Sequence, residues 1–266
     1  ALVSMSAIAG YGMAPTNPGF VSFLSCAVGT TLTSSAANSI NQYLEVDLDA
    51  RMNRTKNRPI VQKILGRKQV MNFAFLCGFI GGLILWAGSN GLTSFLGVSN
   101  IFLYTHVYTP MKRTSVANTW VGSVVGAVPP MMGWTAATGS LGLGAWLLAG
   151  VLFAWQFPHF CSLSWNLRGD YGKAGYKMMS VVDPQLCKNT NLEFSICLMF
   201  ITVAFPIFQL TTWTFFVLAL PLNLGLVELS WRFYRNGTNP DSKVLFKFTL
   251  IHLPLYFALM FLFKLG

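Results

Sequence analysis

The sequence predicts an all-α integral membrane protein, in which nine transmembrane helices form a single polytopic domain over residues 1–266. Its composition is the first indication: 53% of the residues are apolar, only 10% are charged and the mean hydropathy is +0.53. A soluble domain carries about a quarter charged residues. The long apolar runs are the second indication, because a membrane helix takes roughly 20 residues. The composition excludes a soluble globule, a disordered chain and a disulfide scaffold.

The apolar runs divide the chain into nine predicted spans. They cover residues 1–15, 19–42, 69–89, 92–109, 118–139, 142–165, 192–210, 212–233 and 244–264. The first run is short for a bilayer, and Ala1 already lies inside an apolar pattern. We therefore expect that upstream sequence is missing, including the rest of that helix and any targeting segment. The loops after the first, third, fifth and seventh spans are short and uncharged.

Charge gathers on one side of the predicted membrane, which is the third indication. Of 18 Lys and Arg residues, all but Lys247 and Lys264 lie in or beside the loops after the second, fourth, sixth and eighth spans. The positive-inside rule places these loops in the cytoplasm or the mitochondrial matrix. One interpretation of the net charge of +10 is that the basic residues only set topology and contact anionic lipid; nucleic acid is not an expected partner. Most carboxylates share this face, and because acids contribute little to orientation, the mixture favours a site for a metal and an anion.

The end of the second span carries a ladder of oxygen ligands. Asn41, Glu45 and Asp49 are spaced by four residues, which places them on one helical face over roughly 12 Å. Mg²⁺ prefers oxygen and takes one or two carboxylates together with substrate phosphates. Arg54 and Arg58 follow as donors to phosphate oxygens. The pattern predicts a magnesium–diphosphate platform; the alternative is a set of polar residues facing water at a helix end.

Two further polar segments follow later spans. After the sixth span, Asp170 is a candidate second metal ligand, with Arg168 and Lys173 as candidate phosphate partners. The alternative there is a polar turn with a glycine-rich tip. After the fourth span, Lys112 and Arg113 are candidate diphosphate ligands, although adjacent cations at a membrane surface also serve as anchors.

These segments resemble the protohaem IX farnesyltransferases (haem O synthases), which belong to the UbiA superfamily of intramembrane prenyltransferases. The resemblance extends over nearly the whole chain from Ala9 onward, and is carried by residues 38–59, 108–118 and 122–139, by Gln156–Phe160 and by Asp170 with Tyr171. It implies helices around a central cavity. Two positions depart from the superfamily pattern: Glu45 stands where many members have Asp, and Ala174 stands where a second Asp is common. The number of Mg²⁺ ions is thereby left open.

The resemblance also implies roles for individual residues. Asn41, Glu45 and Asp49 would form the first metal motif and Asp170 the second acidic site, while Arg54, Arg58, Lys112 and Arg113 would grip the diphosphate. His159 matches a Pro-His-Phe motif of the family and lies at the loop-side end of the sixth span. It could ligate haem iron, pair with a propionate or shuttle a proton. The alternative is a histidine hydrogen-bonded between helices.

The implied reaction transfers a farnesyl group from farnesyl diphosphate to a vinyl group of haem b, with addition of water, giving haem O on the way to haem A. Mg²⁺ would be the cofactor and haem b a substrate. A homo-oligomer, or hand-over of product to a haem A synthase, would agree with this role. Residues 122–139 and 178–184 look closer to eukaryotic members, which favours the mitochondrial inner membrane with the charged face toward the matrix. A bacterial plasma membrane, with that face toward the cytoplasm, is the alternative.

Two other classes of function share parts of this pattern. A UbiA-type prenyltransferase acting on an aromatic quinone precursor would use the same magnesium–diphosphate site. A transporter or channel would place charged residues near the bilayer midplane, often in two related halves. The centres of the predicted spans are nearly free of ionisable residues, which disfavours a transporter.

Overall fold

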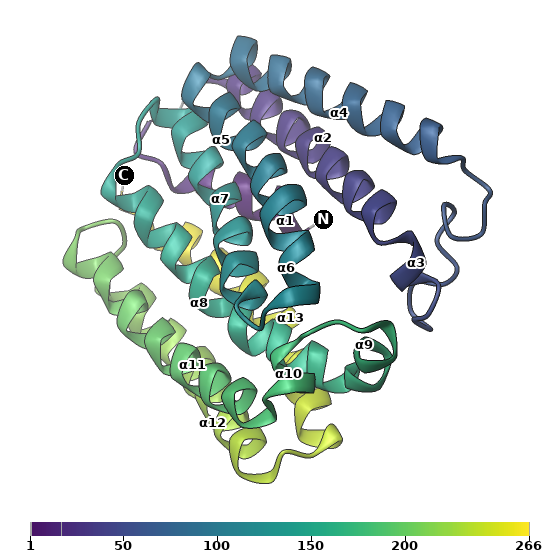
Figure 1. Ribbon diagram of the computed structural model, residues 1–266. Coiled ribbons are helices and arrows are strands. Elements are labelled where there is room, and N and C mark those ends of the chain that lie inside the picture. The colour runs from purple at the N-terminus through teal and green to yellow at the C-terminus, as the bar shows by residue number, and fades with distance from the viewer. Residues whose placement is uncertain (1, 17, 266) are drawn as a thin grey trace.

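The computed structural model describes residues 2–16 and 18–265 as a bundle of long helices with short helices at one end (Figure 1). The long helices are α1 (Leu2–Met13), α2 (Phe20–Leu44), α4 (Arg67–Gly88), α5 (Gly91–Phe102), α7 (Asn118–Thr138), α8 (Leu143–Asn166), α11 (Pro184–Ile207), α12 (Trp213–Asn236) and α13 (Asn239–Leu262). The short ones are α3 (Val46–Asp49), the π-helix η1 (Leu103–Tyr108), α6 (Thr109–Thr114), α9 (Arg168–Ala174) and α10 (Met179–Val182). Within the described ranges, extended pairing is limited to a single bridge between Thr211 and Lys264.

Among the described residues, 6 helices are long and apolar enough to cross a membrane: α2, α4, α8, α11, α12 and α13. The apolar helix α1 has only 12 residues. Helix α5 also has 12 residues and continues directly through η1 into α6. The all-helical prediction is therefore confirmed, whereas nine crossings stays a prediction. Ala1, where the first predicted span begins, lies outside the described residues.

Helix α8 lies at the centre of the bundle. Its Ala145, Leu148, Ala154 and Phe157 have no exposed surface. The outer helices turn large apolar side chains outward, as Phe75 and Phe79 of α4 do. A sequence with so few charges can leave such surfaces only where lipid covers them, which agrees with a membrane environment.

Small residues let α1 and α7 pack closely against each other. A Cβ at Gly133 in α7 would lie 1.8 Å from the carbonyl oxygen of Ala7 in α1, so only glycine permits this approach. Close backbone contact of this kind supplies the packing energy that the hydrophobic effect cannot provide inside a membrane. The contact fixes α7, and with it one wall of the central cavity.

The segments that follow α2, α6 and α8 meet at one end of the bundle. The backbone N–H of Lys177 donates to the carbonyl of Lys112 at 2.7 Å, and the backbone N–H of Asn53 donates to Asp170 at 3.1 Å. At the opposite end, Lys264 donates to the carbonyls of Gly12 and Ala14. Three of the four charged loops predicted to share one face are thus joined by direct hydrogen bonds.

Candidate active site

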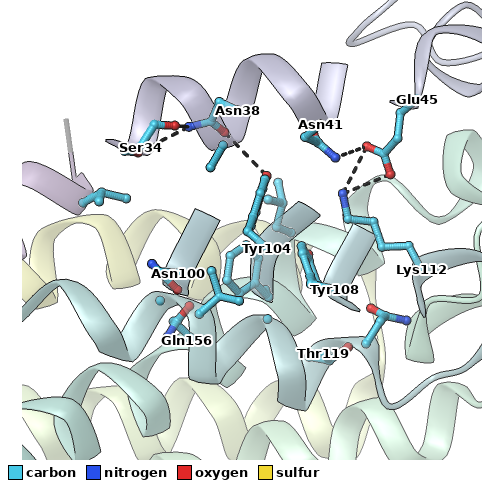
Figure 2. A pocket seen from close by; sticks show the side chains of 18 of the residues that line it. Ser34, Asn38, Asn41, Glu45, Asn100, Tyr104, Tyr108, Lys112, Thr119 and Gln156 are labelled. Atoms are coloured by element: carbon cyan, nitrogen blue, oxygen red, sulfur yellow. Dashed lines mark hydrogen bonds and ion pairs between the residues drawn. The ribbon is translucent and has the colours of Figure 1, made fainter. Parts of the chain in front are cut away.

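A cavity of about 420 Å³ lies between α2, the continuous α5–η1–α6 run, α7 and α8 (Figure 2). One end carries charged side chains, among them Glu45, Asp49 and Lys112. The other end, called the inner end below, is uncharged and is lined by apolar residues such as Val125 and Met132 together with polar ones. A cavity with one charged and one uncharged, partly apolar end suits an amphipathic molecule that has an anionic head and a hydrocarbon tail.

The ladder at the end of α2 keeps its helical face through a break in the helix. Helix α2 ends at Leu44, and Glu45 caps it with a φ of −104° before α3 begins, so the ladder extends over two helical segments. The helical hydrogen bonds nevertheless continue, from Glu45 N–H to the Asn41 carbonyl at 3.0 Å and from Asp49 N–H to the Glu45 carbonyl at 2.8 Å. Asn41, Glu45 and Asp49 are all buried and all line the cavity.

Glu45 forms the centre of a buried polar cluster that joins two elements distant in sequence. Lys112 Nζ lies 3.1 Å from each of its carboxylate oxygens, and the Asn41 amide donates to Oε2 at 2.8 Å (Figure 2). Burial lowers the pKa of Lys112, and the negative charge of Glu45 acts in the opposite direction. A buried ammonium facing a cavity is a strong partner for a phosphate oxygen.

The chain after α3 folds back so that its arginines reach the cavity. The Thr55 hydroxyl donates to the Asp49 carbonyl at 3.0 Å, which closes a tight loop. Arg58 forms an ion pair with the Asp49 carboxylate, and Arg54 also lines the cavity. Both arginines predicted to contact diphosphate therefore lie on the cavity wall.

A second ladder, not recognised in the sequence, faces the first. Tyr104, Tyr108 and Lys112 repeat the spacing of four residues seen at Asn41, Glu45 and Asp49. Lys112 Nζ lies 4.8 Å from the centre of the Tyr108 ring and 5.9 Å from that of Tyr104, as in cation–π contacts. Both rings belong to η1, and π-helical turns are frequent at functional sites. The repeated spacing of four residues is the sequence feature that indicates this second ladder.

Two further tyrosines complete the charged end. Tyr171 and Tyr176 both line the cavity, and Gly175, with a φ of +84°, ends α9 so that the chain can turn back there. Burial raises the pKa of both phenols; the charge of Glu45 adds to the effect at Tyr176, whereas Arg54 opposes it at Tyr171. They are therefore protonated near neutral pH and available as hydrogen-bond donors.

Several predicted site residues do not line this cavity. The Asp170 carboxylate accepts hydrogen bonds from the backbone N–H and side-chain amide of Asn53, at 3.1 and 3.3 Å. Arg113, Arg168 and Lys173 are exposed, and Arg168 stacks on the Trp165 ring. Within the described ranges, no three His, Cys, Asp or Glu side chains cluster as metal ligands. The carboxylates at the cavity are those of Glu45 and Asp49.

His159 lies in the interface between α8 and α13. Its Nδ1 is 2.9 Å from the Thr249 hydroxyl, and its ring stacks on Trp155 with centroids 4.7 Å apart. The side chain is buried, and it is not among the described residues that line the cavity. This position agrees with the alternative of a histidine hydrogen-bonded between helices, while a direct functional role stays a prediction.

Comparison with known proteins identifies relatives in both sequence and structure. A profile of the UbiA prenyltransferase family matches residues 3–251. The chain is 52% identical over 260 residues to a human protein named mitochondrial protoheme IX farnesyltransferase, and the match covers 98% of this chain. It spans 59% of the length of that relative.

Solved structures share the fold at low sequence identity. A digeranylgeranylglyceryl phosphate synthase superposes with a TM-score of 0.82 at 10% identity, covering 98% of this chain and 92% of the other. A UbiA homologue from Archaeoglobus fulgidus, solved with GPP and Mg²⁺, gives a TM-score of 0.68 at 11% identity, covering 97% and 94%. At these identities the likeness concerns the fold alone.

Proposed function

Because this chain belongs to the UbiA prenyltransferase family, we propose that it transfers the farnesyl group of farnesyl diphosphate to a vinyl group of haem b, giving haem O. The name of the human relative supports the choice of substrates. The observation that carries the proposal is the buried ion pair Glu45–Lys112 beside the partly buried pair Asp49–Arg58, at one end of a cavity whose other end is uncharged.

The residues at the charged end fit a hard divalent cation. Glu45, Asp49 and Asn41 offer carboxylate and amide oxygens to the cavity, and Mg²⁺ typically takes one or two carboxylates beside substrate phosphates. Bound there, Mg²⁺ would neutralise the charge that develops on the departing diphosphate. Asp170 accepts two hydrogen bonds from Asn53 and is not among the described residues that line the cavity, so its assignment to the metal stays a prediction.

The basic and phenolic side chains have a separate task. Arg54, Arg58 and Lys112 bind the diphosphate oxygens, because charge-assisted hydrogen bonds stabilise the leaving group as the allylic C–O bond breaks. Tyr171 and Tyr176 donate further hydrogen bonds from the same end of the cavity. The exposed Arg113, Arg168 and Lys173 act from outside, where they attract anionic substrate and lipid headgroups.

The setting proposed for this reaction is the mitochondrial inner membrane, with the charged end toward the matrix. The name of the human relative contains the word mitochondrial, and the basic segments gather at one end of the bundle. Matrix-facing orientation follows from the positive-inside rule. Homo-oligomerisation and hand-over to a haem A synthase stay predictions.

Product analysis tests the proposal. Purified protein is incubated with haem b, farnesyl diphosphate and Mg²⁺, with EDTA as the control, and the porphyrin is examined by mass spectrometry. The expected result is a hydroxyethylfarnesyl porphyrin that forms only with Mg²⁺. Prenylation of a small aromatic acid with haem b left unchanged would instead assign the protein to the quinone-precursor class.

A further inference from the structure

The inner end of the cavity is uncharged and contains hydrogen-bond acceptors. Asn100 lines it from α5 and Gln156 from α8. The Asn100 Oδ1 atom is buried and has no hydrogen-bond partner among the described residues. An unpaired buried carboxamide oxygen is costly, and more so inside a membrane, so its presence calls for a ligand that donates a hydrogen bond.

Two backbone carbonyls reinforce this set of acceptors. Pro129 and Pro130 have no N–H, so the carbonyls of Val125 and Gly126 lose the hydrogen bonds that an uninterrupted helix would supply. Val125, Gly126 and Pro129 all line the cavity. Irregular backbone is tolerated at membrane depth where it borders a cavity.

Gln156 is held in place by its nitrogen, which leaves its oxygen for a ligand. Nε2 donates to the carbonyls of Ser123 and Leu152 at 2.9 and 3.0 Å. A Cβ at position 126 would lie 2.0 Å from Oε1 of Gln156, so the glycine there makes room for the carboxamide. The cavity lining thus offers several acceptors together with the unpartnered hydroxyl of Thr30, which can donate or accept, and a water molecule can bond to groups of both kinds.

The acceptors lie farther toward the inner end of the cavity than the proposed diphosphate position. Lys112 Nζ reaches to 5.9 Å from the centre of the Tyr104 ring, and Asn100 is one helical turn farther along the same run. Figure 2 shows Lys112, Tyr108, Tyr104 and Asn100 in this order, with Gln156 labelled at the Asn100 end. A diphosphate at Lys112 therefore places its allylic carbon beside Tyr104, with the acceptors next in line.

Resting on the function proposed above, we propose that Asn100 and Gln156, with the carbonyls of Val125 and Gly126, hold the water molecule that adds to the prenylated vinyl group. A cavity that is polar at one point and roomy enough retains water, and water brings the hydrogen-bond donors that these oxygens lack. Asn100 and Gln156 are thus positioning residues that act through the bound water.

The proposed reaction begins with the loss of diphosphate and ends with the addition of water. The C–O bond of farnesyl diphosphate breaks, and its electron pair leaves with the diphosphate. The vinyl π electrons form the new bond to the farnesyl carbon, which leaves a positive charge on the vinyl carbon attached to the porphyrin. The oxygen of the held water binds that carbon, and the water loses one proton to the diphosphate. Without water at this place, the cation loses a proton from the neighbouring carbon and an alkene forms instead of the alcohol.

The ratio of alkene to alcohol is therefore the measurement that tests the proposal. The side chains introduced by Asn100→Val and Asn100→Thr have nearly the same shape and differ in one hydroxyl group. The native Asn100 Oδ1 has no intramolecular hydrogen bond that either substitution would break. Gln156→Met removes the second carboxamide. Asn223→Leu is the matched control, because it also removes a buried carboxamide, and Asn223 is not among the described residues that line the cavity. Products formed in heavy-oxygen water are analysed by mass spectrometry.

We expect Asn100→Val and Gln156→Met to raise the alkene-to-alcohol ratio at least about fivefold, as the loss of one hydrogen bond to the water implies. Asn100→Thr should restore much of the native ratio, and Asn223→Leu should leave it unchanged. A purely structural defect would reduce both products together. An unchanged ratio in Asn100→Val and Gln156→Met, or equal loss of both products in the Val and Thr variants, overturns the proposal. Wild-type protein that makes no porphyrin adduct overturns the proposed function itself.

Discussion

Two buried polar regions of this molecule show how differently an apolar bundle can use polar residues. At the charged end of the cavity, Glu45 and Asp49 pair with Lys112 and Arg58. In the interior of α11, α12 and α13, neutral groups bond to one another. Asn223 donates to Thr202 at 2.9 Å, His252 Nε2 lies 3.1 Å from Asn223 Oδ1, and Thr202 lies 2.9 Å from the Tyr256 hydroxyl.

The comparison shows that burial alone does not identify a functional residue. All four members of the neutral network are at most 1% exposed, yet none is among the described residues that line the cavity. Neutral interhelical hydrogen bonds add modestly to helix packing in membranes. Buried charges are costly and are retained mainly where a ligand needs them. The charged end is therefore expected to govern turnover, and the neutral network to govern stability.

The largest effect should come from removing one charge at the cavity. Asp49→Asn keeps the shape of the side chain but replaces a proposed carboxylate ligand of the metal by a neutral amide and removes the charge that pairs with Arg58, so kcat/KM should fall at least about 100-fold. Asp47→Asn in the same short helix is the control, because its side chain is 86% exposed, and it should retain normal turnover. Near-normal product formation by Asp49→Asn, measured by mass spectrometry, would remove this residue from the site.

Lys112 and its neighbour Arg113 allow a comparison over one position. Lys112→Met removes the ammonium that faces the cavity and should raise the KM for farnesyl diphosphate about tenfold, the loss of one charge-assisted hydrogen bond. Arg113→Ala removes an exposed cation and should leave the KM nearly unchanged. Equal KM values for the two variants in steady-state assays would contradict the assignment of Lys112.

Asp170 should show an intermediate effect, since it holds a loop and does not line the cavity. Asp170→Asn retains an acceptor for the Asn53 backbone N–H, so we expect kcat to fall only about threefold. A loss as large as that of Asp49→Asn, measured in the same assay, would place Asp170 on the metal as the sequence predicts.

The smallest effect on catalysis should come from the neutral network. Asn223→Leu breaks the bonds to Thr202 and His252 and should cost about 1 kcal/mol in the free energy of unfolding, measured in detergent. His159→Ala should behave similarly, because it loses the contact with Thr249. In folded protein both should keep the KM for farnesyl diphosphate, and a strongly raised KM for His159→Ala would give that histidine a role at the site.

The tertiary structure separates residues that look equivalent in the sequence. Lys112 and Arg113 are adjacent cations, but helical geometry turns only Lys112 toward Glu45. Asp170 and Asp49 both stand beside basic residues, yet Asp170 contacts Asn53 rather than the cavity. Tyr104 and Tyr108 gain their importance only because η1 packs across from α2.

By itself the sequence determined the helical membrane architecture, the one-sided charge and the ladder of Asn41, Glu45 and Asp49 with Arg54 and Arg58. These features depend on hydropathy and on spacing along one stretch of chain, which local physics fixes. Only the tertiary structure decided that Lys112 pairs with Glu45, that His159 lies between helices, and that the carbonyls beside Pro129 border a cavity. Each of these depends on how segments far apart in the chain pack together, and hydropathy and local spacing do not determine that packing.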